Sequence, residues 1–262
     1  MIIRADKEVC LKKTKDIKIT MIRIALIGFA LLAWELSARK GLYNTIFTSY
    51  PSEILLDLKE FYLSGELIKH SSITLKEASL GLLYGTLTGI LFGLILSQIK
   101  ALGSIFVPII TAIHGVPQLT LAPVYVLWFG LGLTSKIFLS GLMVFFNVFF
   151  ATYAGANNIE PKLVESAKIL CANRLETLFL VIFPTSLPWI LSGIKSGLGS
   201  CLVGAIIGEY IGASAGFGWM ISYATSFFNI SRVMSCILIL LVVGVVINHV
   251  MDAVEGWLLR WQ

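Results

Sequence analysis

The sequence predicts an all-α membrane protein with six transmembrane helices. The hydrophobic fraction is 57%, and the charged fraction of 13% is about half the share usual in soluble domains. The mean hydropathy is +0.88, so lipid is the expected solvent for most of the surface. Six apolar runs, each long enough to cross a bilayer as a helix, complete the prediction.

The predicted spans are separated by connectors that are richer in charge. They cover residues 21–38, 78–97, 104–130, 136–154, 188–208 and 233–250. The third span contains Pro108, Pro117 and Pro123, which are tolerated where neighbouring helices cover the freed carbonyl groups. A basic start before an apolar run would also fit a secretory signal over 1–38, but no small-x-small cleavage site follows cleanly.

Lys and Arg residues set the expected orientation. Seven of the 20 precede residue 24, and 13 of the 20 lie on the cytoplasmic side if the N-terminus is inside. An even number of crossings then places both termini in the cytoplasm. The expected organisation is a basic cytoplasmic tail over 1–20, a first span over 21–38, an extracytoplasmic segment over 39–77, a core transmembrane domain over 78–250 that includes a cytoplasmic loop over 155–187, and a cytoplasmic tail over 251–262.

The segment over 39–77 contains the stretch PSEILLDLKEFYL. Its length suits an amphipathic helix. We interpret it as a solvated or interfacial connector.

Small residues recur at helical spacing in two spans. Four glycines of the second span are spaced every four residues: Gly81, Gly85, Gly89 and Gly93. A row of small residues in the fifth span begins with Gly193 and Gly197. Such stripes allow two helices to approach closely, so we predict a packed bundle. Lining of a solute path is the alternative reading of the same glycines.

A charged stretch, EPKLVESAKILCANRLETLFLVIFPTSLP, lies between the fourth and fifth spans. Pro161 suits the first position of a helix. That helix is expected to stop near Asn173, which can adopt a left-handed conformation. A second helix is expected over 174–183, before Pro184 and Pro188 break the path. The stretch is therefore predicted to be two short rods that offer a partly apolar face to a partner with a groove.

Part of this stretch, ESAKILCANRLETLFLVIFP, resembles the EAA signature of ABC importer permeases. The positions that match the signature are Glu165, Ala167, Val181 and Pro184. The positions that depart from it are Ser166, Cys171 and Phe183, which stand for Ala, Gly and Leu. The stretches VPQLTLAPVYVLWFGLGLTSKI, AGANNIEPKLVESA and GEYIGASAGFGWMI resemble the nitrate/sulfonate/taurine branch of these permeases.

The resemblance implies a type I ABC importer permease fold with a cytoplasmic coupling helix. The residues expected to dock on a separate ATPase subunit are Glu165, Ser166, Ala167, Cys171 and Pro184. ATP with magnesium is expected on that subunit, because the chain itself has no G-x-x-x-x-G-K-[ST] loop. No cofactor and no enzymatic activity are expected in this chain.

The expected partners are two copies of the ATPase subunit, an extracytoplasmic solute-binding protein, a second permease copy in a homodimer, and membrane lipid, with no nucleic acid. The implied location is the inner membrane of a bacterium. The implied solute is small and either anionic, such as nitrate, taurine or an alkanesulfonate, or heteroaromatic.

Several ionisable residues lie in or near the spans, where such groups are candidates for function. His114 and Glu209 are possible contacts along a substrate path, and solvation at the outer interface is an equal alternative for Glu209. Lys195 is expected to reach the cytoplasmic face, and Glu35 remains a candidate without an assigned role. The three His and four Cys form no CxxC pair or cluster, so no metal site is expected.

An ion-driven secondary transporter or channel is the alternative function. It would require an internal repeat and buried charges in the spans. We find no convincing repeat between residues 21–130 and 136–250.

Overall fold

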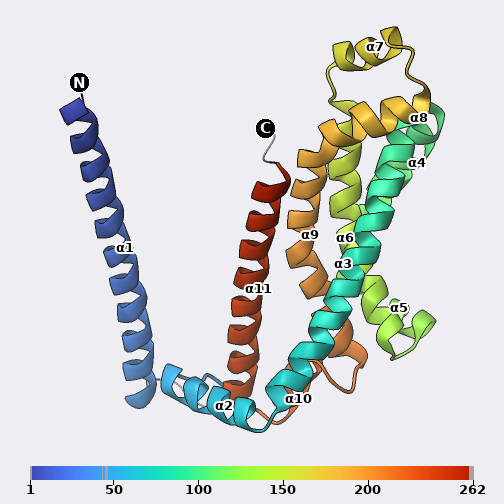
Figure 1. Ribbon diagram of the computed structural model, residues 1–262. Coiled ribbons are helices and arrows are strands. Elements are labelled where there is room, and N and C mark those ends of the chain that lie inside the picture. The colour runs from blue at the N-terminus through green and yellow to red at the C-terminus, as the bar shows by residue number, and fades with distance from the viewer. Residues whose placement is uncertain (1, 43, 45–46, 260–262) are drawn as a thin grey trace. The chain divides into compact units, whose positions relative to one another are not determined.

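The computed structural model describes residues 2–42, 44 and 47–259, and regular structure in this part is helical (Figure 1). Residues 1–18 make up most of the predicted basic tail, and their side chains lie outside the described part. The α-helices are α1 Ile2–Arg39, α2 Pro51–Leu63, α3 Glu66–Gln98, α4 Lys100–His114, α5 Ala122–Phe129, α6 Leu133–Asn157, α7 Pro161–Ile169, α8 Arg174–Thr177, α9 Phe183–Gly212, α10 Phe217–Ser226 and α11 Ile230–Leu258. A 3₁₀ turn, η1 (Gln118–Leu121), precedes α5, and a π-helical turn, η2 (Leu178–Ile182), joins α8 to α9.

Five helical segments of the described chain are long and apolar enough to cross a membrane, and a bent pair makes a possible sixth. The bent pair is α4 with the segment from η1 to α5, and its two arms meet at 78°. The predicted proline-interrupted span over 104–130 corresponds to this bent pair, whose break lies at residues 115–117. Pro108 stays inside α4, whereas Pro117 precedes η1 and Pro123 lies in the first turn of α5, where its missing N–H costs no hydrogen bond.

The predicted spans are shorter than the helices that contain them. The second span belongs to α3, which begins at Glu66, so the end of the predicted extracytoplasmic segment is already helical. The basic tail is likewise part of α1. The amphipathic helix that the sequence suggests is α2, whose bounds match the stretch PSEILLDLKEFYL and which buries Ile54 and Phe61.

The described chain divides into two compact units. One contains residues 1–61 and 224–235, and the other contains residues 62–223 and 236–262. In the first unit, Glu35 near the end of α1 accepts hydrogen bonds from the backbone N–H of Ser52, at 3.0 Å, and from its hydroxyl, at 2.7 Å. Glu35 thus stabilises the N-terminus of α2, where a carboxylate is favourable.

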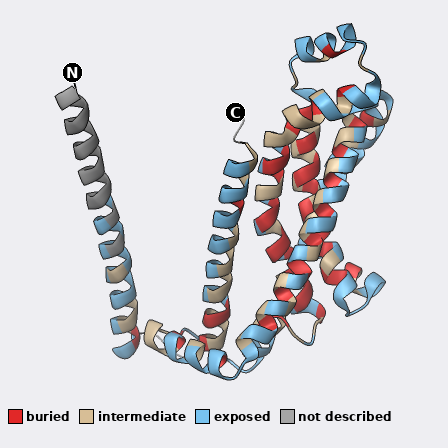
Figure 2. Cartoon of the chain, viewed as in Figure 1, coloured by how far each residue is buried: buried red, intermediate tan, exposed pale blue. Residues whose placement is uncertain are grey.

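The second unit is built on α3, α6 and α9, whose buried residues form one core (Figure 2). Its centre contains the small and β-branched side chains of Ala78, Val144, Val148, Cys201 and Ala205. Small side chains let the helix axes approach, which is how membrane helices gain packing energy.

The glycine stripe of α3 lies directly against α6. A Cβ atom added at Gly89 would lie 2.8 Å from Cβ of Val148, and one at Gly93 would lie 2.7 Å from Cβ of Thr152. On α9, a Cβ atom at Gly193 would lie 2.7 Å from Cβ of Ala151. Glycine at these positions therefore sets how closely α3 and α9 approach α6.

Candidate functional site

The loop between α6 and α9 extends beyond the end of the helices in the second unit, with α7 at its tip (Figure 1). Pro161 occupies the first turn of α7, as the sequence predicts. Ser166 donates a hydrogen bond of 2.8 Å to the carbonyl of Lys162 within the helix. Ala167 is buried, whereas Glu165 and Ser166 are exposed. The helix therefore packs one face on the protein and offers the other outward.

The turn after α7 is closed by two backbone hydrogen bonds across Cys171. The N–H of Cys171 donates to the carbonyl of Lys168, and the N–H of Ala172 donates to the carbonyl of Ala167, both at 3.0 Å. This is the Schellman arrangement, whose central residue is left-handed. Cys171 holds that conformation with φ of 59°, at the position where the resemblance expects Gly.

Asn173 does not take the left-handed position, so that prediction was wrong. Its φ of −72° and ψ of 173° are extended, and its side chain accepts the N–H of Glu176 at 2.9 Å. The Glu176 carboxylate in turn accepts the N–H of Asn173 at 2.7 Å. This reciprocal pair is a capping box, and it fixes the start of α8 rather than the end of α7.

The second rod is not separated from the following span, contrary to prediction. The segment from Arg174 to Gly212 runs as one helical stretch of 39 residues. Pro184 lies in the first turn of α9 and Pro188 lies inside it. The N–H of Phe183 bonds to the carbonyl of Leu178. This π turn widens the backbone just before Pro184, where the ring would clash with a regular α-helical turn.

Exposed apolar side chains surround the turn at Cys171. Ile169 is 80% exposed, Leu170 is 81% exposed and Leu175 is 67% exposed. We call the outward-facing group the coupling surface; its residues are Glu165, Ser166, Ile169, Leu170, Cys171 and Leu175. An exposed apolar patch with a charged edge, on a short rigid loop, is typical of a protein-binding surface.

The residues expected along a substrate path do not meet in one place. The exposed His114 ends α4 and its ring lies 4.8 Å from that of Phe146 and 5.2 Å from that of Phe150, between centroids. Glu209 is fully buried, so the alternative of a solvated carboxylate is wrong. Lys195, which is expected to reach the cytoplasmic face, forms ion pairs with Asp252 at 2.5 Å and with Glu255 at 3.1 Å.

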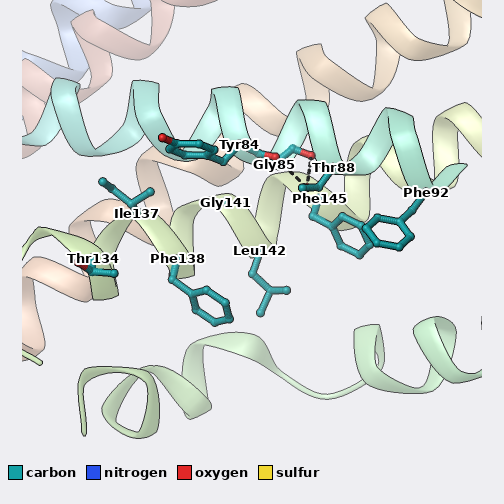
Figure 3. Close-up of a pocket in the computed structure, with 10 residues that line it drawn as sticks. All are labelled: Tyr84, Gly85, Thr88, Phe92, Thr134, Ile137, Phe138, Gly141, Leu142 and Phe145. Carbon is teal, nitrogen blue, oxygen red and sulfur yellow. Dashed lines mark hydrogen bonds between the residues drawn. The ribbon is translucent and has the colours of Figure 1, made fainter. Parts of the chain in front are cut away.

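A cavity of about 480 Å³ lies between α3 and α6 (Figure 3). Its lining side chains are aromatic, aliphatic or hydroxyl-bearing, and none is charged; the main ones are Tyr84, Thr88, Phe92, Thr134, Phe138 and Phe145. Sequence reasoning missed this cavity. The signal is present, since Tyr84, Thr88 and Phe92 recur every four residues beside the glycine stripe.

No group of three or more His, Cys, Asp or Glu side chains in the described chain could hold a metal ion.

A family comparison decides the class of protein. The profile of the family described as binding-protein-dependent transport system inner membrane component matches residues 85–261. The chain belongs to this family. It is an ABC importer permease, a multi-pass inner-membrane transport component, and the alternative of an ion-driven transporter or channel is set aside.

Curated relatives cover most of the permease. A Bacillus subtilis protein named as an aliphatic sulfonates transport permease, SsuC, is 34% identical over 87% of this chain and 83% of its own length. The Escherichia coli taurine transport system permease TauC is 29% identical over 91% and 89%. The Halalkalibacterium halodurans formylaminopyrimidine transport permease ThiX is 28% identical over 88% and 92%. These names agree with the predicted branch, and they differ in solute.

Solved structures of the methionine ABC transporter MetNI, in inward-facing conformations, share the fold. One aligns with a TM-score of 0.66 at 16% identity over 75% of this permease and 97% of that chain. Another aligns with a TM-score of 0.64 at 17% identity over 73% and 95%. The predicted type I ABC importer permease fold is confirmed.

Proposed function

We propose that this permease imports a small solute by alternating access, driven by a separate ATPase subunit that docks on the coupling surface. The observation that supports this most directly is the continuity of the chain behind that surface. The turn at Cys171 leads into α8, and the segment from Arg174 to Gly212 continues without a break into the bundle. A push on α7 and α8 would therefore move α9 as a rod.

The proposed assembly contains two permease copies, two ATPase copies that carry ATP with magnesium, and a solute-binding protein on the outer side. The family description, which names binding-protein-dependent transport, supports the last of these partners. Both termini and the coupling surface would be cytoplasmic. The excess of Lys and Arg on that side supports this orientation.

The proposed solute has an apolar or aromatic body and a polar group that accepts hydrogen bonds. The relatives named for aliphatic sulfonates, taurine and formylaminopyrimidine fit that description. The cavity between α3 and α6 is a candidate part of the path, because the rings of Phe138 and Phe145 line it beside Tyr84; the Thr88 hydroxyl donates to the carbonyl of Tyr84 at 2.7 Å. Aromatic walls with a few polar groups suit such a ligand.

Docking is tested by co-purification. The permease with an affinity tag, expressed with its ATPase subunit, should retain that subunit. Glu165→Arg should reduce retention at least about tenfold, because reversing a contact charge introduces repulsion with its partner. The matched control is Glu60→Arg, the same substitution at an exposed position of α2. Equal retention by Glu165→Arg and the control would count against docking through Glu165.

A further inference from the structure

Three ionisable side chains meet inside the second unit, one from each of its main helices. Glu77 of α3 is 4% exposed, Lys136 of α6 is 2% exposed and Glu209 of α9 is 0% exposed. Charged groups at this depth are stable only when neighbouring atoms compensate them. The hydrogen bonds that each of the three side chains makes indicate which of them carries a charge and which carries a proton.

Glu209 has both carboxylate oxygens in use as acceptors. Its Oε1 accepts the hydroxyl of Thr74 at 2.7 Å, and its Oε2 accepts the backbone N–H of Gly218 at 2.7 Å. The Thr74 hydroxyl in turn accepts the N–H of Phe217 at 2.9 Å. Two donors directed at two oxygens are the pattern of an ionised carboxylate.

Lys136 contributes a positive charge and no hydrogen to either carboxyl group. Its ammonium group donates to the carbonyls of Leu131 and Gly212, and to that of Gly132 at 2.9 Å. An ammonium group has three hydrogens, so these three carbonyls use all of them. Lys136 therefore offsets one of the two carboxylate charges through space.

Glu77 is the member whose environment does not suit a negative charge. Its Oε2 is buried without a hydrogen-bond partner. Glu77 lies one helical turn along α3 from Thr74, whose hydroxyl bonds Glu209, so its buried carboxyl group shares the face of α3 that is turned to the Glu209 carboxylate. Two neighbouring buried carboxylates cannot both be ionised at low cost, and one proton between them removes the repulsion and supplies the missing hydrogen.

We propose that Glu77 and Glu209 form a proton-binding site in which one proton resides on Glu77 and is donated to Glu209. The cluster is then neutral, with Glu209 ionised and Lys136 protonated. His70 of α3 reaches the loop beside Glu209, because its Nδ1 accepts the N–H of Gly216 at 2.9 Å and Gly216 packs against the Glu209 carboxyl group. Helix α10 brings no Asp, Glu, Lys, Arg or His.

The proton stabilises the contact of α10 with α3 and α9. At the start of this helix, three backbone N–H groups donate hydrogen bonds to side chains. The N–H of Gly216 donates to His70, that of Phe217 to Thr74, and that of Gly218 to Glu209. These side chains come from α3 and α9. Loss of the proton would leave two buried carboxylates side by side with only the charge of Lys136 to offset them, and their repulsion would weaken the junction of the three helices.

The test is infrared spectroscopy of the purified full-length permease in lipid at neutral pH, in which the spectrum of each variant is compared with that of the wild type. We expect a carbonyl-stretch band of a protonated carboxylic acid. The band should be lost in Glu77→Gln, which mimics the protonated group, and retained in the control Glu60→Gln, whose carboxylate is exposed. Glu77→Gln should also keep the thermal unfolding midpoint of the wild type.

Two results would overturn the proposal. The first is the absence of a protonated-acid band in the wild type, which is decisive even if Glu77→Gln fails to fold. The second is a band that persists in Glu77→Gln and disappears in Glu209→Gln, because the proton would then belong to Glu209.

Discussion

Arg232 donates from Nε to both carboxylate oxygens of Asp57, at 2.9 and 3.0 Å, and so joins the start of α11 to α2. The Arg232 guanidinium also lies 4.3 Å from the centroid of the Phe61 ring. Both charged side chains are nearly buried, at 12% and 10% exposure. This pair is a nearly buried polar link inside the unit that contains residues 1–61 and 224–235.

Removing one partner of this pair should destabilise the protein. Asp57→Asn leaves Arg232 nearly buried with a weaker acceptor, and we expect a loss of about 2 kcal/mol in the free energy of unfolding. The measurement is a double-mutant cycle with Arg232→Gln, followed by thermal unfolding in detergent. Strict additivity of the two single changes would contradict the coupling.

The turn after α7 should be improved by glycine. Cys171 adopts φ of 59°, which costs an L-residue about 1 kcal/mol that glycine does not incur. Cys171→Gly should therefore slow hydrogen exchange at the N–H of Ala172, and Cys171→Val should accelerate it. Faster exchange in the glycine variant would show that the turn is not formed as described.

The contact between α3 and α6 should tolerate no added methyl group. Gly89→Ala would place Cβ 2.8 Å from Cβ of Val148, so the helices must separate, at a cost of about 1–3 kcal/mol. The control is Gly199→Ala on α9, where nothing lies within 4 Å and a higher helix propensity is the main effect. Equal thermal midpoints for the two variants would contradict the close approach.

Thr74 should require its hydroxyl group. Thr74→Val keeps the shape of the side chain but removes the donor to Glu209 and the acceptor for Phe217, which leaves buried polar groups without partners. We expect a loss of about 2 kcal/mol or more in unfolding free energy. Thr74→Ser, which keeps the hydroxyl, should lose less than half as much. An unchanged thermal unfolding midpoint for Thr74→Val would contradict a stabilising role for this hydrogen-bond network.

Much of the fold can be predicted because each span must satisfy its backbone internally and bury few charges. These constraints locate the apolar runs within α3, α6, α9 and α11, and they locate α2 by its amphipathic pattern. Helix ends are less predictable. Pro184 and Pro188 indicate breaks in isolation, but a π turn before Pro184 lets the helix continue.

Sequence reasoning also missed the cluster of buried charges. Glu77 and Lys136 resemble solvated charges in a connector when each span is read alone. One signal was available, since Glu77 precedes Gly81 by four residues and so shares the face of the glycine stripe. That Glu77 would meet Glu209, 132 positions away, depends on how α3 and α9 pack, and no local pattern contains that information.

The central claim is that the coupling surface faces the cytoplasm, and Cys171 offers a direct probe of it. Cys171 is exposed, whereas Cys201 and Cys236 are buried. In a variant with Cys10→Ser, a membrane-impermeant maleimide should label Cys171 in inverted membrane vesicles and leave it unlabelled in intact spheroplasts. Labelling of Cys171 from the outside of intact spheroplasts would contradict the account.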